Sequence, residues 1–451
     1  MGIYQKLKFL IGKVTVLIMA VIFPFAVIAQ NRKVSSAFCN IFIALALLVL
    51  LCAVINKLIN SKDGFKDIIT TGIKSRCVVP GILILLSVVW CFISPAAGYE
   101  FSGTGSIIQG MLLFIGCTCI YIVISACYSY EETDMMIMIV ASVIINIITI
   151  LRFLISAKYC TDAYCMYTVM MFAVCVYAFL LSDDNKKIYY LTAAGLCEMG
   201  LISATGNMAV TGMVIVLLVM QPIALRKYEC FTRYELIVLM IFILGRLFAY
   251  INVFTNKVIV LSASSAFLTS YKTTAFIIAG CIIYMMLIIF DDRVKGCIKN
   301  IRKVVLNRIY MCITGLDIIV IITIVMINNY RNNYTFYLMI FIGIIQILMS
   351  VAVFIFATHN VLESIEDRTK PEKDISNSND DSLLQGYGSR YMITAIGMAV
   401  IAYILQGTGN LFKFEVFPVF ICFAAIMSTY NKNCGSYDMY PESWTHIYEL
   451  G

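Results

Sequence analysis

Long apolar runs separated by short polar segments make up most of this chain. Most runs are about 20 residues long, which is the length at which a helix crosses the ~30 Å hydrocarbon core of a bilayer. Stretches such as 37–56 and 334–357 are apolar on every face, whereas the strands of a membrane barrel alternate apolar and polar positions. The pattern therefore predicts an all-α fold, a polytopic bundle of transmembrane helices.

The pattern gives fourteen spans, within a range of twelve to fourteen, with the N-terminus and the C-terminus inside. They lie at about 9–29, 36–56, 77–95, 107–128, 135–155, 163–182, 187–204, 208–225, 235–253, 273–290, 309–328, 334–357, 391–408 and 413–430. Only Thr205, Gly206 and Asn207 separate the seventh run from the eighth. If these two runs formed one long helix, every later loop would change side.

Composition and charge placement support a membrane location. The chain is 61% apolar and 13% charged, where a soluble domain has about 25% charged residues. The inner loops hold most of the 33 Lys and Arg residues, as the positive-inside rule expects. The basic loop 291–308 then marks orientation and contact with acidic lipids, so the net charge of +7 predicts no nucleic-acid partner.

The domain organisation follows from the same pattern. We expect a single integral membrane domain over 1–451, with a flexible cytoplasmic linker at 358–390 and a short C-terminal tail at 431–451. The first apolar run ends in a tolerable cleavage site at 27–29, but it is longer than the core of an ordinary secretory signal. It is therefore interpreted as an uncleaved first helix.

Cysteines and histidines predict no metal site. The chain has 17 Cys, mostly within spans, where a thiol packs like a small apolar residue. No C-x-x-C pair occurs, and both His359 and His446 fall on the inner side. Cys160 and Cys165 share an outer loop, and whether they form a disulfide depends on how oxidising the compartment is.

Ionisable residues inside the predicted spans are the first candidates for function, because a charge in hydrocarbon is costly. Arg246 is the clearest case, Arg152 lies nearer an outer end, and Glu198 and Asp317 lie within spans. Two interpretations of Arg246 stay open. It forms a structural pair with Glu198 or Asp317, or snorkels to the headgroups; alternatively, its guanidinium binds an anionic substrate such as a phosphate. Glu198 and Asp317 are also candidate proton-relay carboxylates.

Other polar residues within the spans point to structure more than to chemistry. Asn146, Gln109, Gln346 and Gln406 lie in apolar surroundings, where such side chains mostly join helices by hydrogen bonds. The chain has no phosphate-binding loop, nucleophile elbow or carboxylate pair. The catalytic residues are therefore unassigned, and no cofactor is predicted.

Two parts of the chain carry a resemblance to a known family. The first is Ala-Val-Ile-Ala-Tyr-Ile-Leu-Gln-Gly at 399–407, followed by Asn410 and by Phe-Pro-Val-Phe at 417–420. The second runs from 163 to 225, with a polar turn at 183–187 and Ser-Ala-Thr-Gly-Asn at 203–207. These parts resemble the bacterial O-antigen ligase and O-antigen polymerase superfamily.

The resemblance implies an integral membrane glycosyltransferase of surface-polysaccharide assembly in the bacterial cell envelope. Such proteins use glycans linked to polyprenyl pyrophosphate at the outer face of the plasma membrane, without a metal or a soluble nucleotide sugar. Family arginines near that face bind the pyrophosphate, a role that would fall to Arg246, Arg331 and Arg152. Asn207 stands where the family has an arginine, and only 328–333 stands where it has a large outer loop, so the chain would be a degenerate member.

Two other classes of function compete with this interpretation. Fourteen spans and a cationic cavity also suit a transporter or flippase of lipid-linked oligosaccharide, whose expected signature is pseudo-symmetry between halves. A non-catalytic scaffold that binds other polysaccharide-assembly proteins is the second alternative, favoured by the missing arginine and loop. An enzyme or a flippase should fail when Arg246 or Arg331 is replaced, whereas a scaffold should keep working.

Overall fold

The computed structural model describes residues 3–28, 107–128, 130–156, 162–182, 186–204, 207–224, 228–255, 271–289, 315, 381–409 and 416–434. Every regular element in these ranges is a helix, and no strand occurs there. The predicted all-α class is confirmed for the described part of the chain. The predicted spans at 36–56, 77–95 and 334–357 lie outside it, as does the span at 309–328 apart from Gly315.

The described helices follow the predicted apolar runs closely. In chain order they are α1 (Ile3–Leu17), the π-helical turn η1 (Ile18–Ile22), α2 (Phe23–Ile28), α7 (Ile107–Cys127), α8 (Glu132–Ser156), α9 (Asp162–Leu181), α10 (Lys187–Ser203), α11 (Asn207–Ala224), α12 (Tyr228–Thr255), α14 (Tyr271–Ile289), α18 (Asp381–Gly409) and α19 (Phe417–Cys434).

The break between α10 and α11 falls where the sequence predicts it. The backbone of Ala204 is extended, with φ −74° and ψ 140°, so the helix cannot continue. The Gly200 carbonyl accepts the Ala204 amide at 3.1 Å and also the Ser203 hydroxyl at 2.8 Å, so the last turn of α10 is closed by both bonds. The prediction of two separate helices at 187–204 and 208–225 is confirmed.

α18 and α19 extend into the ranges predicted as the linker and the C-terminal tail. α18 begins at Asp381, within the range 358–390 that the sequence assigned to a flexible linker, and α19 continues to Cys434, within the predicted tail. The polar residues at these positions suggested an exposed chain, but polar side chains are compatible with a helix that extends beyond an apolar layer. The range 381–390 is therefore helical in the structure, while the rest of the predicted linker lies outside the described residues.

The first helix contains a local irregularity with a clear cause. η1 joins α1 to α2 without a break, and Pro24 is the second residue after it. Proline lacks an amide donor and its ring crowds the carbonyl four residues earlier, at Ala20. A π-helical turn widens the backbone at this point, which allows the long first helix to continue past the proline.

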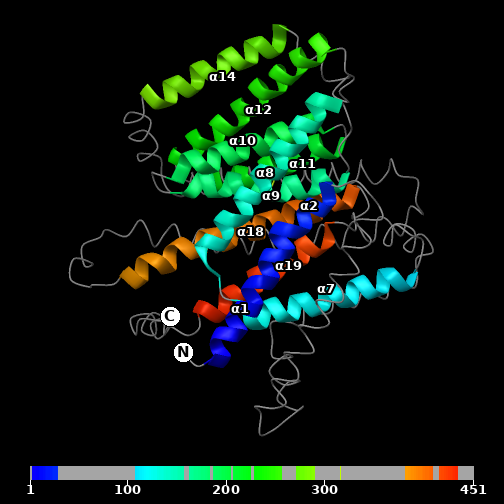
Figure 1. Cartoon of the computed structure of the whole chain (residues 1–451). Helices are drawn as coiled ribbons and strands as arrows, with labels where there is room; N and C mark the ends of the chain where they lie inside the picture. Colours follow the sequence, from blue (N-terminus) through cyan, green and yellow to red (C-terminus); the bar gives the residue numbers. More distant parts are fainter. Residues whose placement is uncertain are drawn as a thin grey trace.

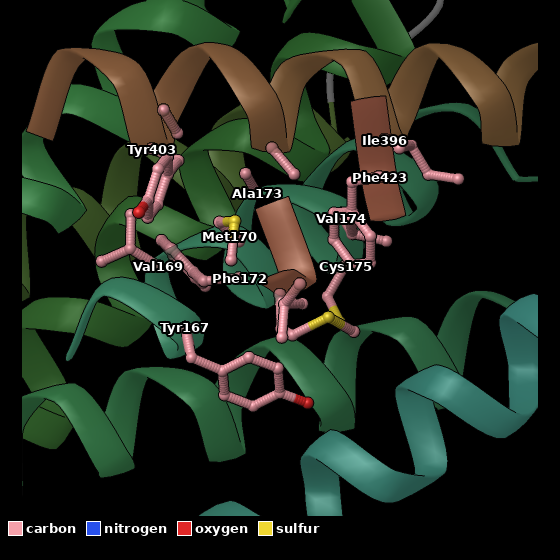
Figure 2. Packing of buried hydrophobic residues seen from close by; sticks show 14 of the residues in the cluster. Tyr167, Val169, Met170, Phe172, Ala173, Val174, Cys175, Ile396, Tyr403 and Phe423 are labelled. Carbon is pink, nitrogen blue, oxygen red and sulfur yellow. The ribbon is translucent and has the colours of Figure 1, made fainter. Parts of the chain in front are cut away.

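α9 is the central helix of the described bundle. Every residue from Ala163 to Leu180 is buried, and a helix that is apolar on all sides is expected in such a position. α18 lies across α9, while α8, α10 and α11 surround its other sides (Figure 1). Figure 2 shows Tyr403 of α18 beside Val169 and Met170, and Ile396 beside Val174.

Contacts between described helices define their relative directions. Tyr190 near the start of α10 donates to Met136 near the start of α8, and Asn146 contacts Cys197 farther along both helices, so α8 and α10 run the same way. α18 and α19 run in opposite directions, because Tyr403 stacks on Phe420 with ring centroids 4.7 Å apart while Gly397, earlier in α18, lies against a later part of α19.

α12 and α14 also run in opposite directions. Arg246, late in α12, contacts Thr274 near the start of α14, and Leu239, earlier in α12, contacts Gly280 farther along α14. At the other end of α12, Arg233 reaches the last carbonyls of α9. The starts of α12 and α10 therefore lie near the same end of the bundle, because α10 begins just after α9 ends.

α8 has the opposite amphipathicity to a helix on the surface of a soluble protein. Its polar side chains Ser142, Asn146 and Thr149 are buried, whereas Val140 is 56% exposed and Leu151 is 50% exposed. The exposed apolar positions recur every three or four residues and form one stripe: Ile137, Val140, Ile144, Ile147, Ile148, Leu151, Leu154 and Ile155. α14, at the edge of the bundle beside α12 (Figure 1), likewise exposes isoleucines and methionines.

Two of the described helices have the length and apolar composition needed to cross a membrane. They are Thr133–Ile155 within α8 and Asp162–Leu181, which is α9. Shorter apolar helical segments occur in α1, α7, α11, α14, α18 and α19. These helices support association with a membrane, because a helix of about 20 apolar residues matches the hydrocarbon thickness.

Candidate functional site

A buried polar cluster joins α8, α9 and α10. The Asn146 amide nitrogen donates to the Ser142 carbonyl at 2.8 Å and lies 3.5 Å from Cys197 Sγ. The Asn146 amide oxygen accepts a 2.5 Å hydrogen bond from the Tyr164 hydroxyl and a longer one, 3.5 Å, from Thr168. The helix-joining role expected for Asn146 is therefore observed, and its partners come from all three helices.

Gly200 allows this cluster to form. A Cβ atom at position 200 would overlap both the Tyr164 hydroxyl oxygen and the Asn146 amide oxygen. The Cys197 thiol, one turn earlier on α10, lies 3.8 Å from the Ser142 hydroxyl. A glycine inside an apolar helix usually has such a packing reason, so Gly200 itself was a signal in the sequence from which this contact could have been suspected.

Glu198 is adjacent to this cluster but does not join it. Its side chain is 0% exposed, and neither carboxylate oxygen has a hydrogen-bond partner among the described residues. The predicted pair between Arg246 and Glu198 is therefore not formed. Within the described chain, Glu198 is a buried acid whose oxygens accept no hydrogen bond.

Glu198 lies on the side of α10 that faces α12. Gly195 precedes it by three residues, and residues three apart share one side of a helix. A Cβ atom at Gly195 would lie 3.3 Å from Met240 Sδ of α12. Helix periodicity therefore directs Glu198 toward α12, the helix that carries Arg246.

Two of the three predicted substrate-binding arginines lie on neighbouring helices. Phe153 of α8 and Phe248 of α12 are both buried, with ring centroids 6.4 Å apart. Arg152 directly precedes Phe153, and Arg246 precedes Phe248 by two residues. Arg152 is exposed and Arg246 is half-buried, so the two guanidinium groups come from helices that meet at one aromatic contact.

Arg246 has a defined hydrogen-bond acceptor in the structure. Its Nη1 donates to the Thr274 hydroxyl of α14. The hydroxyl is neutral, so this bond orients the guanidinium without cancelling its charge. Of the interpretations from sequence, the structural pair with Glu198 is absent from this arrangement, and the binding of an anionic substrate by Arg246 stays a prediction.

Gln406 is buried where α18, α11 and α9 meet. Its side chain is 2% exposed, and a Cβ atom at Gly212 of α11 would lie 2.9 Å from Gln406 Nε2 and would overlap Val169 of α9. The glycine lets these helices approach closely, as small residues do in membrane bundles. This position fits the predicted role of Gln406 as an intramembrane polar residue that joins helices.

An ion-pair cluster that was not predicted connects α1 to the turn between α7 and α8. Lys13 Nζ lies 2.5 Å from Glu131 Oε2 and 3.2 Å from Asp134 Oδ1. Asp134 is 0% exposed and also accepts a 3.1 Å hydrogen bond from the Tyr128 hydroxyl. Gly12 permits the approach, because a Cβ there would lie 2.6 Å from the Tyr128 amide nitrogen.

A second unpredicted contact closes the end of α9. Arg233 of α12 donates to the carbonyls of Phe179, Leu180 and Ser182 at 3.0, 2.9 and 2.9 Å. These carbonyls lack intrahelical partners at a helix C-terminus, and a cation there interacts favourably with the helix dipole. Arg233 is a structural cap, which sequence alone could not reveal because the two helices are separated by α10 and α11.

Several candidate residues lie outside the described part of the chain. Asp317, Arg331, Cys160 and both histidines belong to undescribed ranges, so their predicted roles stay predictions. In the ranges that are described, no group of three or more His, Cys, Asp or Glu side chains could hold a metal ion.

These observations define the class of the protein. The described part of the chain is an all-helical bundle with a mainly apolar interior that also buries several polar side chains, with exposed apolar faces on α8 and α14 and with two helices of membrane-spanning length. Comparison with known proteins adds no relative, since no family model, no curated protein and no solved structure matches the chain.

Proposed function

We propose that this chain is a multi-pass helical protein of a bacterial plasma membrane, with fourteen spans and both termini inside. The apolar stripe of α8 supports this proposal, because a face of this size exposed to water would promote aggregation, whereas in a bilayer it faces lipid. The relative directions of α8, α10 and α12, of α12 and α14, and of α18 and α19 also agree with the fourteen-span alternation.

Photolabelling from the lipid phase tests the membrane location. The full chain is reconstituted into vesicles with a phospholipid that carries a diazirine in its acyl chain, irradiated and mapped by mass spectrometry. Ile144 is 44% exposed and its neighbour Ile145 is 0% exposed, so adducts are expected at the first and not at the second. The proposal would be contradicted if α8 carried no adducts in a sample in which the reagent had labelled the lipids.

Within this class, we propose that the protein transfers or joins glycans linked to polyprenyl pyrophosphate at the outer face. The observation that carries the proposal is the Phe153–Phe248 contact, since each ring lies within two residues of an arginine, Arg152 in α8 and Arg246 in α12. A pair of guanidinium groups would suit a pyrophosphate, which carries several negative charges and accepts bidentate hydrogen bonds from them.

The packing of α9 and α18 gives further support. The two parts of the sequence that resemble the O-antigen ligase and polymerase superfamily lie far apart in the chain. In the fold, α9, α10 and α11 contain one part, and α18 and α19 contain the other. α18 packs directly against α9 (Figure 2), so the resemblance concerns one contiguous region of the bundle.

The proposed reaction is a direct displacement at the sugar. An acceptor hydroxyl attacks the anomeric carbon, the bond from that carbon to the pyrophosphate oxygen breaks, and polyprenyl pyrophosphate leaves with the electron pair. The hydroxyl proton passes to water. Arg152, Arg246 and Arg331 are the residues proposed to stabilise the negative charge that develops on the leaving group, a form of catalysis by fixed electrostatics.

The test uses the host strain with and without the gene, and sizes both the polyprenyl-linked glycans and the surface polysaccharide. Single repeats that accumulate on the outer leaflet indicate a polymerase, and finished polymer retained on lipid indicates a ligase. Repeats trapped on the inner leaflet would instead identify a flippase. No change in either pool would refute every polysaccharide function.

Complementation with matched variants then tests the arginines. Arg246→Gln should fail to restore the glycan profile, while Thr274→Val, which removes the neutral hydroxyl to which Arg246 donates, should restore most of it. The same purified variants must show wild-type helical content and elution volume. If Arg246→Gln folds and restores the profile fully, Arg246 does not bind substrate, and a scaffold becomes the better interpretation.

A further inference from the structure

The buried acid Glu198 has no assigned task in the proposed glycan chemistry. Its side chain is 0% exposed, and both of its oxygens lack a hydrogen-bond partner among the described residues. Transferring an ionised carboxylate into apolar surroundings without a partner is far more costly than transferring the neutral acid. The geometry in this structure therefore suits the protonated form of Glu198.

The groups that α8, α9, α10 and α11 present around Glu198 offer no charge to compensate it in this arrangement. α8 presents the neutral Ser142 and Asn146, and α11 has no titratable side chain in its sequence. The buried titratable side chains of α9 and α10 at the neighbouring polar cluster are tyrosines and cysteines, none of which is a cation: Tyr164, Tyr167, Cys175 and Cys197. None of these groups would stabilise an ionised Glu198 by its charge.

Among the described helices that contact α10, the remaining one is α12, and it carries two cations. Arg233 is held by the carbonyls at the end of α9, and Glu235 lies near the same end of α12. Arg246 follows Met240 by six residues, or about 9 Å along the axis, and Glu198 follows Gly195 by three, or about 4.5 Å. Since the helices run the same way, Arg246 lies roughly one turn beyond Glu198.

We propose that Glu198 is a proton-exchanging site whose ionised form is stabilised by Arg246. In the arrangement seen here, in which Arg246 donates to Thr274, the proposal assigns the neutral form to the buried acid. When water enters between α10 and α12, the carboxyl O–H bond breaks, the proton passes to water, and the carboxylate accepts a hydrogen bond from the guanidinium. Proton uptake reverses these steps, so the contact between α10 and α12 has two arrangements.

This inference goes beyond the proposed glycan reaction and does not depend on it. A buried acid that exchanges one proton with water would serve an enzyme or a transporter equally. The two proposals can therefore fail separately: titration of the purified chain decides the proton site whatever the glycan assay shows, and the glycan pools decide the reaction whatever the titration shows.

Infrared difference spectroscopy of the reconstituted full chain provides the test. A protonated carboxyl group has a C=O stretching band separate from that of a carboxylate, and the band shifts in D₂O. We expect a band at neutral pH that is present in the wild type and missing in Glu198→Gln, a substitution that keeps the shape of the neutral acid. It should disappear reversibly as the pH is raised, while helical content stays constant.

The partner residue is tested by the same titration. Removing the cation disfavours the ionised acid, so in Arg246→Gln the band should persist to a pH higher by about one to three units. Thr274→Val serves as the matched control, because it removes a competing acceptor and keeps the guanidinium charge, and its transition should lie at the wild-type pH or below it.

Several results would overturn the proposal. The first is the absence of a Glu198 band at neutral pH, which would mean that the group is already ionised. The second is a band that never titrates while the protein stays folded, which would make Glu198 a permanently neutral packing residue. An unchanged transition in a folded Arg246→Gln variant would exclude Arg246 as the stabilising cation. If the Glu198→Gln variant fails to fold, the Glu198→Asp variant identifies the carboxyl band instead, because the band should shift between the wild type and this variant.

Discussion

Substitution of Gly200 by alanine should destabilise the bundle by removing one specific hydrogen bond. The new methyl group would overlap the Tyr164 hydroxyl and the Asn146 amide oxygen, and these two atoms now form a 2.5 Å hydrogen bond inside the protein. Both side chains are buried among α8, α9 and α10, so neither can move without disturbing a neighbouring helix. The substitution should therefore act through sterics and through the lost hydrogen bond together.

The magnitude follows from three contributions. Forcing a methyl group into a filled core costs about 1–3 kcal/mol. The hydrogen bond adds about 0.6 kcal/mol if bilayer averages apply and about 1–3 kcal/mol if its atoms lose their partners completely. Alanine offsets about 1 kcal/mol of this through its higher helix propensity. The expected net loss is about 2–3 kcal/mol.

Gly195→Ala is the matched control on the same helix. Gly195 is buried as well, but a Cβ there would meet only the end of the flexible Met240 side chain, at 3.3 and 3.5 Å. Because methionine can adjust its rotamer, the helix propensity of alanine should make this variant at least as stable as the wild type. The two glycines differ in their neighbours and little else.

Equilibrium unfolding in mixed micelles with increasing denaturing detergent, monitored by circular dichroism, gives the free energies. In a double-mutant cycle, Gly200→Ala should cost less in the Tyr164→Phe background than in the wild type. The overlapping hydroxyl is absent in that background, and its hydrogen bond to Asn146 is already lost. The reasoning would be refuted if Gly200→Ala were as stable as the wild type, or if Gly195→Ala lost as much.

Three further substitutions test other contacts with the same unfolding measurement. Lys13→Met should lower the free energy of unfolding by about 3 kcal/mol, because it leaves the buried Asp134 without this cation. The double variant Lys13→Met/Asp134→Asn should recover most of that loss. No recovery would mean that the Lys13–Asp134 pair is not the cause. Arg233→Met should cost about 1–2 kcal/mol at the end of α9, and Arg233→Lys should cost less, since it keeps the charge. Phe420→Leu should lose about 0.5–1.5 kcal/mol with the aromatic stack on Tyr403, an effect that should vanish in the Tyr403→Leu background.

The helices could be predicted well from the sequence because the signal for them is local. Twenty consecutive apolar residues define a helix in a bilayer regardless of its neighbours, and α7, α8, α9, α10 and α11 begin and end within three residues of the predicted spans. Even the weak separation at Thr205 and Gly206 was predicted correctly. Where the apolar signal fades, as at the start of α18, the predicted helix boundary came too late.

Partners inside the bundle could not be predicted, because they depend on which helices touch. Glu198, Arg246 and Asn146 stand out in the sequence as unusual, but the suggested Glu198–Arg246 pair is not formed. Lys13 lies within a predicted span, yet its partners Glu131 and Asp134 are more than a hundred positions away. A charge pair across such a separation leaves no trace in local periodicity.

The distribution of polar groups in the fold gives the strongest argument about what this chain can do. Several buried polar groups are satisfied within the bundle: Asn146 by Tyr164 and Ser142, Asp134 by Tyr128 and Lys13, and the end of α9 by Arg233. These contacts fix helix positions and leave little capacity for chemistry. Glu198 accepts no hydrogen bond from the described residues and Arg246 donates to a neutral hydroxyl, so a change of charge or the binding of an anion in the described bundle falls most easily on the interface between α10 and α12. A function assigned to this chain should therefore explain why an acid and a guanidinium are kept one turn apart there.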